Sequence, residues 1–295
     1  MIIEHKKYKA FYYSHRVLQK LLNIIPDSLY LRIIFFLQTG RKLNLRSPKT
    51  YNEKIQWLKL FDGKKRYSKY ADKVFAKETA GKLIGPEYII PTLGVWNSIS
   101  EVDFEVLPDK FVLKCTHDSG SNYICSDKAK IDYDKLSNFF TKRLSTNYYW
   151  YLREWQYKDV IPRIIAEPFI GIDNIPDDFK FFCFDGIPKL LMVVKIIDGK
   201  RYSRFFDMHL APLQLQIGNP IFEGQIELPE NINEMFALAR KLSIGFSHIR
   251  IDLYNINGAI YFGEYTFHHW SGMAYISPKQ WDIELGNWID INLKN

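Results

Sequence analysis

The 295-residue sequence predicts an α+β protein, and three observations lead to that fold class. Helical patterns fill the first third of the chain, short β-rich runs begin at Lys110, and helices and strands then alternate as far as Phe267. Because strands and helices interleave, an α/β arrangement stays open as the alternative. Since 47% of the residues are hydrophobic, the chain can bury the core of one large domain or of two to three closely joined subdomains.

The first part of the chain is expected to be helical. Residues 8–40 form short amphipathic helices with a break near Pro26, and residues 48–62 form the next helix. Thr50 can cap that helix, and Glu53 three positions later completes a capping box.

The later elements follow from changes in periodicity. A helix over residues 70–83 ends before Gly85, and residues 88–93 are predicted as a strand. The pattern then predicts helices at 133–158 and 231–242, and strands at 110–114, 123–125, 160–170, 178–184 and 190–197.

The last predicted element is a β-hairpin over residues 249–267, and it carries two acidic side chains. A two-residue turn ending at Gly258 would place Asp252 and Glu264 on opposite faces. A three-residue loop ending at the same glycine would instead put Arg250 across from Glu264, with Asp252 diagonal on that face. Two carboxylates beside a guanidinium suit a magnesium ion. The alternative is a surface hairpin with a cross-strand Arg–Glu pair.

Three further places carry candidate binding residues. Lys114 ends an apolar strand and is followed by the small polar loop 117–122, which suits phosphate or is a plain hairpin turn; it lacks the Walker A order. Glu167 lies in an apolar strand and needs a donor, either a nucleotide or a structural partner. Asp178 and Lys180 share one strand face, which suits phosphate, substrate or solvent.

Charge is distributed unevenly along the chain. Residues 1–82 contain 19 of the 40 Lys and Arg residues and 6 of the 33 Asp and Glu residues, a net charge of +13, whereas the remainder is at −6. The basic part indicates either an anionic partner, such as a membrane leaflet or an acidic polymer, or a solvated face. Nucleic acid is not favoured, because no nucleic-acid-binding motif occurs.

Targeting signals and cysteine usage point to the cytoplasm. No apolar run reaches the roughly 18 residues that a membrane span requires, and no signal-peptide layout occurs. The three cysteines are too few and too far apart for a disulfide framework or a CxxC site. We therefore expect a cytoplasmic protein, with peripheral contact at the inner membrane face left open.

Taken in order, these features resemble the ATP-grasp superfamily and, more narrowly, the TupA-like ATP-grasp family, named for teichuronopeptide biosynthesis. The resemblance extends from about Ser47 to Ser271 through SPKTYNEKIQWLKLFD, YADKVFAKETAGKLIG, KFVLKCTHDSGSN, AEPFI, DDFKFFCFDG and RIDLY…YFGEYTF. It implies an ATP-grasp fold, in which two α+β lobes hold ATP between them, behind a helical, basic N-terminal region. The implied parts are residues 1–108, a small ATP-binding lobe at 109–170 and a large metal and substrate lobe at 171–295.

The resemblance also implies roles for individual residues. For ATP, it implies that Lys114, and Lys73 or Lys77, contact the phosphates. It also implies that the loop of Ser119, Gly120 and Ser121 closes over the nucleotide and that Glu167 holds the adenine or ribose. For the reaction, it implies that Asp178, Lys180 and Arg204 face the acceptor and the transferred phosphoryl group. It also implies that Arg250 neutralises the reacting phosphates and that Asp252 and Glu264 bind magnesium. Thr266 stands where many ATP-grasp enzymes have an asparagine that helps to bind a second metal, so one or two ions are possible.

The activity that the resemblance implies is amide formation. ATP-grasp ligases phosphorylate a carboxylate with Mg²⁺-ATP, and an amine then displaces the phosphate. In the TupA-like family the implied acceptor is a uronic-acid carboxylate of a surface or capsular polysaccharide or its lipid-linked precursor, and the implied donor is an amino acid or amino alcohol. The alternatives are a polysaccharide-biosynthesis glycosyltransferase and a non-catalytic protein that binds polysaccharide or membrane.

Overall fold

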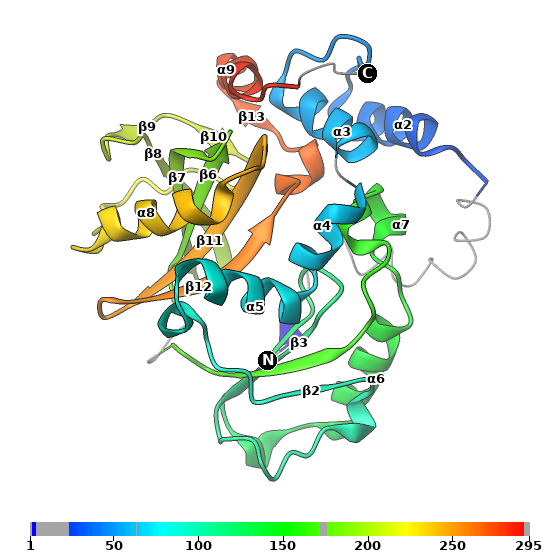
Figure 1. Ribbon diagram of the computed structural model, residues 1–295, viewed down its shortest axis with the longest axis vertical. Helices are drawn as coiled ribbons and strands as arrows, with labels where there is room; N and C mark the ends of the chain where they lie inside the picture. The colour runs from blue at the N-terminus through cyan, green and yellow to red at the C-terminus, as the bar shows by residue number, and fades with distance from the viewer. Residues whose placement is uncertain (1, 4–23, 63, 172–175, 292–295) are drawn as a thin grey trace. The chain divides into compact units, whose positions relative to one another are not determined.

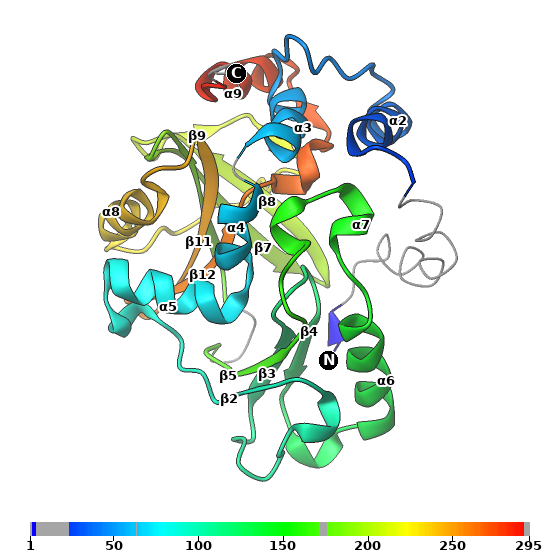
Figure 2. The ribbon, with the colours of Figure 1, turned by 45° about the vertical axis from the view of Figure 1, so that its right-hand side comes forward.

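The computed structural model describes residues 2–3, 24–62, 64–171 and 176–291, which belong to two compact units (Figures 1 and 2). Unit 1 comprises Met1–Asp27, Lys64–Glu78 and Ile90–Ile170. Unit 2 comprises Ser28–Gly63, Thr79–Ile89 and Gly171–Asn295. The helices predicted between residues 8 and 23 lie outside the described residues, and the three-part boundaries expected from the sequence stay a prediction.

Unit 1 is built on an antiparallel sheet with the strand order β1-β4-β3-β5-β2. The strands are β1 (Ile2–Ile3), β2 (Gly94–Trp96), β3 (Phe111–Cys115), β4 (Asn122–Cys125) and β5 (Ile164–Pro168). In β3, Phe111, Leu113 and Cys115 are buried in the core of the unit. Because side chains alternate along a strand, Lys114 is directed to the other face.

The helices of unit 1 follow the predicted helical segments with two corrections. They are α4 (Lys64–Ala71), the start of α5 (Lys73–Ile84), α6 (Tyr133–Leu144) and α7 (Tyr149–Leu152). The helix expected at 70–83 is present as α5 but begins three residues later, because Asp72 separates α4 from α5 and accepts a hydrogen bond from the Val74 amide at 2.9 Å. The strand expected at 88–93 is also absent: Pro86–Tyr88 is a 3₁₀ turn and β2 begins only at Gly94.

Unit 2 is built on a six-stranded antiparallel sheet with the order β12-β11-β6-β7-β8-β9. The strands are β6 (Asp178–Phe184), β7 (Ile187–Ile197), β8 (Lys200–Phe206), β9 (Pro212–Leu213), β11 (His248–Ile256) and β12 (Ala259–Thr266). Helix α8 (Ile232–Ser243) packs against one face of this sheet, where Phe236 meets Phe181 edge to face (Figure 1). A short ribbon of β10 (Gln216–Ile217) and β13 (Ile276–Ser277) completes the β-structure.

The other face of the unit 2 sheet carries the larger core. Phe182, Phe184 and Met192 pack there with Tyr51 and Ile55 of α3 (Tyr51–Phe61), and α9 (Gln280–Trp288) closes the same cluster. This face is almost wholly apolar beneath α3. The polar candidate site must therefore lie where the apolar cluster ends, toward β11 and β12.

Helix α3 confirms its predicted start and also anchors the loop after β12. Thr50 accepts from the Glu53 amide and Glu53 accepts from the Thr50 amide, which completes the capping box. Gln56 and Lys59, both buried in α3, donate to the Ser271 carbonyl at 2.8 Å each. These bonds fix the chain immediately after the last hairpin.

Candidate functional site

The hairpin of β11 and β12 brings the two acidic side chains together through a two-residue turn combined with a β-bulge. The turn is the two-residue one, because Ile256 pairs with Ala259. By itself this turn would place the carboxylates of Asp252 and Glu264 on opposite faces of the hairpin. The register then shifts after Asp252, so that Gly263 is bulged out and Asp252 lies directly opposite Glu264. Of the two turns that the sequence left open, the two-residue turn is therefore present, and a bulge produces the shared face.

The bulge also changes which residue faces Arg250. Arg250 pairs with Thr266 instead of Glu264. On the neighbouring strand, Lys180 lies opposite Asp252. Because paired residues of antiparallel strands share a face, Arg250, Thr266, Lys180, Asp252 and Glu264 all lie on one side of the sheet.

Arg250 is the centre of this cluster. Its Nε and Nη2 donate to the two oxygens of Asp252 at 2.6 and 2.7 Å, a two-point contact. Nη2 also donates to Thr266 Oγ1 at 2.9 Å and to Glu264 Oε1 at 3.2 Å. Arg250 is buried. Its guanidinium plane is thus fixed by three side chains of the hairpin.

Lys180 joins the cluster from β6. Its ammonium pairs with Asp252 and with Asp178. Burial raises the pKa of Asp178, and the charge of Lys180 offsets only part of that effect. Burial would raise the pKa of Asp252 too, but the charges of Arg250 and Lys180 outweigh it and lower the pKa. Two neighbouring carboxyl groups thus have pKa values displaced in opposite directions.

The composition of the cluster fits a magnesium ion bound together with phosphate. Three carboxylates face two cations, so the cluster has a net charge of −1 with the carboxylates ionised. Oδ1 of Asp178 is buried without a hydrogen-bond partner, and the side chain of Glu264 is 46% exposed. Mg²⁺ needs only one or two protein carboxylates when phosphate and water supply the other oxygens. Within the described residues, no three His, Cys, Asp or Glu side chains converge as a self-sufficient metal site.

His269, for which the sequence analysis proposed no chemical role, belongs to the same cluster. Nη1 of Arg250 donates to its Nδ1, so the ring carries its proton on Nε2, a buried atom without a partner. Burial lowers the pKa of His269 well below its ordinary value, and the charges of Arg250 and Lys180 lower it further. The ring is therefore neutral. Trp270 and Ser271, which follow it, both have positive φ angles of 48° and 54°, a conformation that costs free energy for non-glycine residues.

A second cluster of predicted residues lies in unit 1. The carboxylate of Glu167 accepts from Lys77 at 2.7 Å and from Lys114 at 2.6 Å. Burial would raise the pKa of Glu167, but the charges of Lys114 and Lys77 outweigh it and lower the pKa to about 2. Burial lowers the pKa of Lys77, against the effect of Glu167. The group has a net charge of +1 when both lysines are protonated, and Glu167 has structural partners for both of its oxygens.

The polar loop after β3 is held in place by several hydrogen bonds. Lys73 donates to the Cys115 and Asp118 carbonyls at 2.7 and 2.6 Å. Ser121 is buried, donates to the Asp118 carboxylate and accepts from the Cys115 amide at 3.1 Å. Of the three residues predicted to close over ATP, Ser119 and Gly120 therefore remain at the half-buried tip, with Gly120 at φ 82°.

Arg204 does not join the cluster around Arg250. It pairs in register with Val193, which pairs with Phe179, so it lies on the α8 face of the unit 2 sheet, opposite to Lys180. Its guanidinium pairs with the Glu223 carboxylate, at 3.9 Å. The structure thus brings together every other residue predicted for the reaction and places Arg204 apart.

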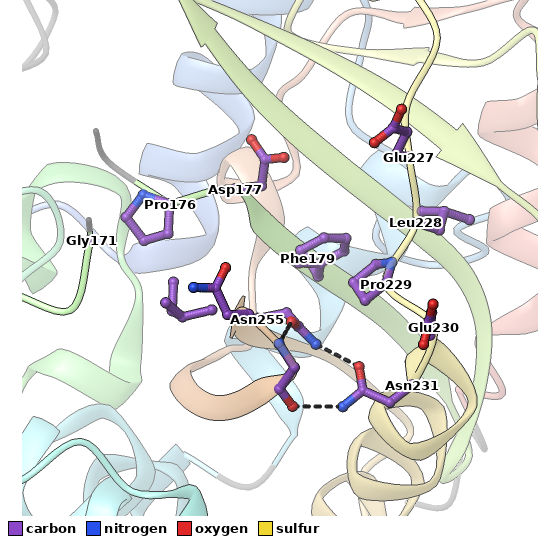
Figure 3. A pocket seen from close by; sticks show the side chains of 13 residues that line it. Gly171, Pro176, Asp177, Phe179, Glu227, Leu228, Pro229, Glu230, Asn231 and Asn255 are labelled. Atoms are coloured by element: carbon purple, nitrogen blue, oxygen red, sulfur yellow. Dashed lines mark hydrogen bonds between the residues drawn. The ribbon is translucent and has the colours of Figure 1, made fainter. Parts of the chain in front are cut away.

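A cavity of about 920 Å³ lies beside the tip of the β11–β12 hairpin, within unit 2 (Figure 3). Asn255 donates to Asn231 at 2.8 Å, and Asn231 donates to the Gly258 carbonyl at 2.8 Å, which fixes one wall. Phe179 and Asp177 line the same cavity, and Asp177 pairs with Lys195. The cavity combines apolar surface with amide and carboxylate groups.

The chain belongs to the TupA-like ATP-grasp family, whose pattern it matches over residues 53–290. This match covers both clusters and confirms the predicted family and the ATP-grasp fold, in agreement with the helices and antiparallel sheets of the two units. No curated protein matches the chain.

Among solved structures, the chain is similar to ATP-grasp ligases. D-alanine–D-alanine ligase from Bacillus anthracis is 16% identical, with a TM-score of 0.40 over 67% of this chain and 57% of that one. The Helicobacter pylori D-alanine–D-alanine ligase is 14% identical, with a TM-score of 0.42 over 74% and 58%. The ATP-grasp ligase PsnB, in complex with a minimal precursor, is 11% identical, with a TM-score of 0.43 over 75% and 61%. The chain thus spans less than two thirds of the length of these structures.

Within the described residues, no helix has both the length and the apolar character required to cross a bilayer. The three cysteines are buried and free.

Three features of the site were not found from the sequence. The bulge at Gly263 gives no periodic signal, although an isolated glycine within a strand pattern is itself a sign of one. His269 lies two residues beyond the hairpin and reaches Arg250 only because the loop turns back through Trp270 and Ser271. Lys77, named only as a substitute for Lys73, is the lysine that pairs with Glu167.

Proposed function

We propose that this protein is an ATP- and magnesium-dependent carboxylate–amine ligase that forms an amide through an acyl phosphate. The observation that carries the proposal is the cluster on β6, β11 and β12, where Arg250 and Lys180 face Asp252, Glu264 and Asp178. In phosphoryl transfer, a protein contributes mainly positioning and charge neutralisation. A rigid cluster of alternating charges suits that task, and membership of the ATP-grasp family supports it.

Each residue has a distinct part in the proposed reaction. Arg250, held by Asp252 and His269, neutralises charge on the transferred phosphoryl group. Lys180 aids the same step from β6. A magnesium ion bound through Asp252 and Glu264 would supply additional charge neutralisation.

In unit 1, the proposed task of the lysines is to hold the nucleotide phosphates. Lys114 and Lys77 share Glu167, so their ammonium groups are oriented before ATP binds. Glu167 thus acts through the two lysines, and it does not need to contact the adenine or ribose.

The proposed acceptor is a uronic-acid carboxylate of a surface or capsular polysaccharide or its lipid-linked precursor, and the donor is an amino acid or amino alcohol. The teichuronopeptide pathway after which the family is named supports this acceptor class. The charge of +13 over residues 1–82 supports an anionic partner.

The test is ADP release by the purified full-length protein, with Mg²⁺-ATP, uronic-acid oligosaccharides and a panel of amines. We expect release that requires both the acceptor and an amine, and we expect Asp252→Asn and Glu264→Gln to abolish it while the protein stays folded. Glu223→Gln, which neutralises an exposed carboxylate away from the cluster, is the matched control. Near wild-type turnover in either cluster variant would remove the metal assignment. Release of UDP from a sugar nucleotide would indicate a glycosyltransferase instead.

A further inference from the structure

Helix α2 (Asp27–Thr39) has an apolar face that the described structure leaves uncovered. Leu29, Ile33, Phe36 and Leu37 are exposed by 50, 45, 52 and 71%. Their spacing of four, three and one residues places them on one side of the helix. The opposite side, with Leu31 and Phe35, is fully buried. The helix is thus apolar on both sides, which is typical of a buried helix, although one side faces outward.

The surroundings of this apolar face are basic. Between Ser28 and Asn52 the chain has five basic residues and no acidic one, and all five are exposed: Arg32, Arg41, Lys42, Arg46 and Lys49. Arg41 pairs with Asp282, which leaves four whose charges no described carboxylate within 4 Å balances. An exposed apolar helix face in a chain segment whose charges all have one sign is typical of an interaction surface.

We propose that the exposed face of α2, together with the basic residues of the same chain segment, is a docking surface for an anionic lipid bilayer. Four large apolar side chains can enter the boundary between headgroups and acyl chains, while lysine and arginine ammonium and guanidinium groups meet the anionic headgroups. Both parts of the surface are used in this arrangement. The proposal does not depend on the ligase activity.

Charge argues against the other occupants of the face. A second copy of the chain would bring five further basic residues against the first five. The segment formed by residues 1–23 has five basic residues and one acidic residue, so it too has the same sign as the face. An anionic polysaccharide would satisfy the charges but would leave the apolar side chains in water. An anionic bilayer satisfies both the charge and the apolar area.

The test uses flotation of the full-length protein with vesicles of phosphatidylcholine, either pure or with about one third phosphatidylglycerol. We expect binding to the anionic vesicles and little to the neutral ones, and weaker binding as salt screens the charges. The double variant Phe36→Ser/Leu37→Ser should bind at least about tenfold more weakly. The triple variant Lys42→Ser/Arg46→Ser/Lys49→Ser should bind roughly a hundredfold more weakly.

The matched control is Met208→Ser/Ile244→Ser, which removes two apolar side chains of nearly equal exposure, 51 and 70%, from other parts of unit 2. It should bind anionic vesicles as the wild type does. Equal binding to neutral and anionic vesicles, or no binding to either, would overturn the proposal. So would a dimer, measured by light scattering, that the Phe36→Ser/Leu37→Ser variant abolishes. Wild-type vesicle binding by that variant, with loss only on deletion of residues 1–23, would assign the membrane contact to that segment.

Discussion

At the scale of single residues, Glu167 is the most heavily constrained group of unit 1. It lies in β5, fully within an apolar strand, and both of its oxygens accept from lysines. A buried carboxylate with two ammonium partners contributes most when it is charged, because its loss leaves both cations uncompensated. The contribution of Glu167 to the free energy of unfolding should therefore decrease as the pH falls.

We predict that Glu167→Gln lowers the free energy of unfolding by about 3 kcal/mol at pH 7. The folded pKa of Glu167 is about 2, below its ordinary value of 4.5. The stabilisation is therefore present above about pH 5 and is lost as the pH falls toward 2. Urea unfolding of both proteins across this range checks the prediction. Glu105→Gln, at an exposed site of the same unit, should leave the curve unchanged. If the free energies of unfolding of the wild type and of Glu167→Gln changed equally with pH below pH 5, the prediction would be contradicted.

Residue identity was easier to predict than residue partnership. Lys114, Glu167, Lys180, Arg250, Asp252 and Glu264 stand out because charged side chains in or beside apolar strands need partners. Their pairing depends on register and loop path, which no local pattern determines. Ser121 shows the difference: its loop looks flexible as a sequence, but Asp118, Lys73 and Arg143 hold it in place. Arg204 shows the same difference: side chains alternate along β8, so the register of this strand decides on which face of the sheet Arg204 lies.

At the scale of elements, the β11–β12 hairpin depends on a single bulge. A methyl group on Gly263 would lie 3.0 Å from the Asp252 carbonyl oxygen and 3.1 Å from Cε2 of Tyr254. The glycine thus allows the two strands to approach closely where the register shifts. Without this close approach, Glu264 would not lie opposite Asp252.

We predict that Gly263→Ala reduces acceptor-dependent ADP release at least about tenfold, because a displacement of under 1 Å at the reacting centre is costly. Stability should fall by only about 1 kcal/mol. The control is Gly199→Ala in the β7–β8 turn, where φ is 73° and no atom lies within 4 Å of the added methyl group. That variant should lose similar stability and keep its activity. If both variants were equally active, the bulge would have no part in the proposed site.

The elements themselves were largely predictable. Strands β3, β4, β6 and β7 and helices α3 and α8 lie within a few residues of their predicted segments, because their apolar runs have the length and residue types of those elements. Strand β8 was not predicted, since its Arg201, Ser203 and Arg204 interrupt the apolar alternation. The break at Asp72 and the bulge at Gly263 were not predicted for a related reason: each is a single-residue irregularity inside an otherwise regular run.

At the scale of the whole molecule, acid sensitivity should come from buried neutral histidines of unit 2. The Cys183 carbonyl can only accept, so Nδ1 of His248 carries the proton and Nε2 accepts from the Tyr51 hydroxyl at 3.0 Å. Burial, together with the charges of His268 and Arg250, lowers the pKa of His248 to about 3. His269 is displaced in the same direction. Protonation of His248 would reverse its hydrogen bond with Tyr51, so that Nε2 donates to the hydroxyl, and would place a buried charge between α3 and β11.

We predict that acidification from pH 7 to pH 5 lowers the free energy of unfolding of unit 2 by about 2 kcal/mol through His248 alone. The sign follows from proton binding. Below pH 6.5 the unfolded chain binds a proton at this histidine and the folded chain does not, so the loss begins near pH 6.5 and continues toward pH 3. The effect of Glu167 begins only below about pH 5, so the change in stability between pH 7 and pH 5 comes from His248 and not from Glu167.

Urea unfolding of His248→Gln at the two pH values isolates this contribution. Glutamine can still donate to the Cys183 carbonyl and accept from Tyr51, so the variant should fold and be less stable than wild type at pH 7 by about 1 kcal/mol. Between pH 7 and pH 5 it should lose about 2 kcal/mol less than the wild type, because it has no proton to bind. His209→Gln, which removes an exposed histidine of the same unit, should follow the wild-type curve. A His248→Gln curve as steep as the wild-type curve would mean that other buried groups, with His269 first among them, set the acid limit of the fold.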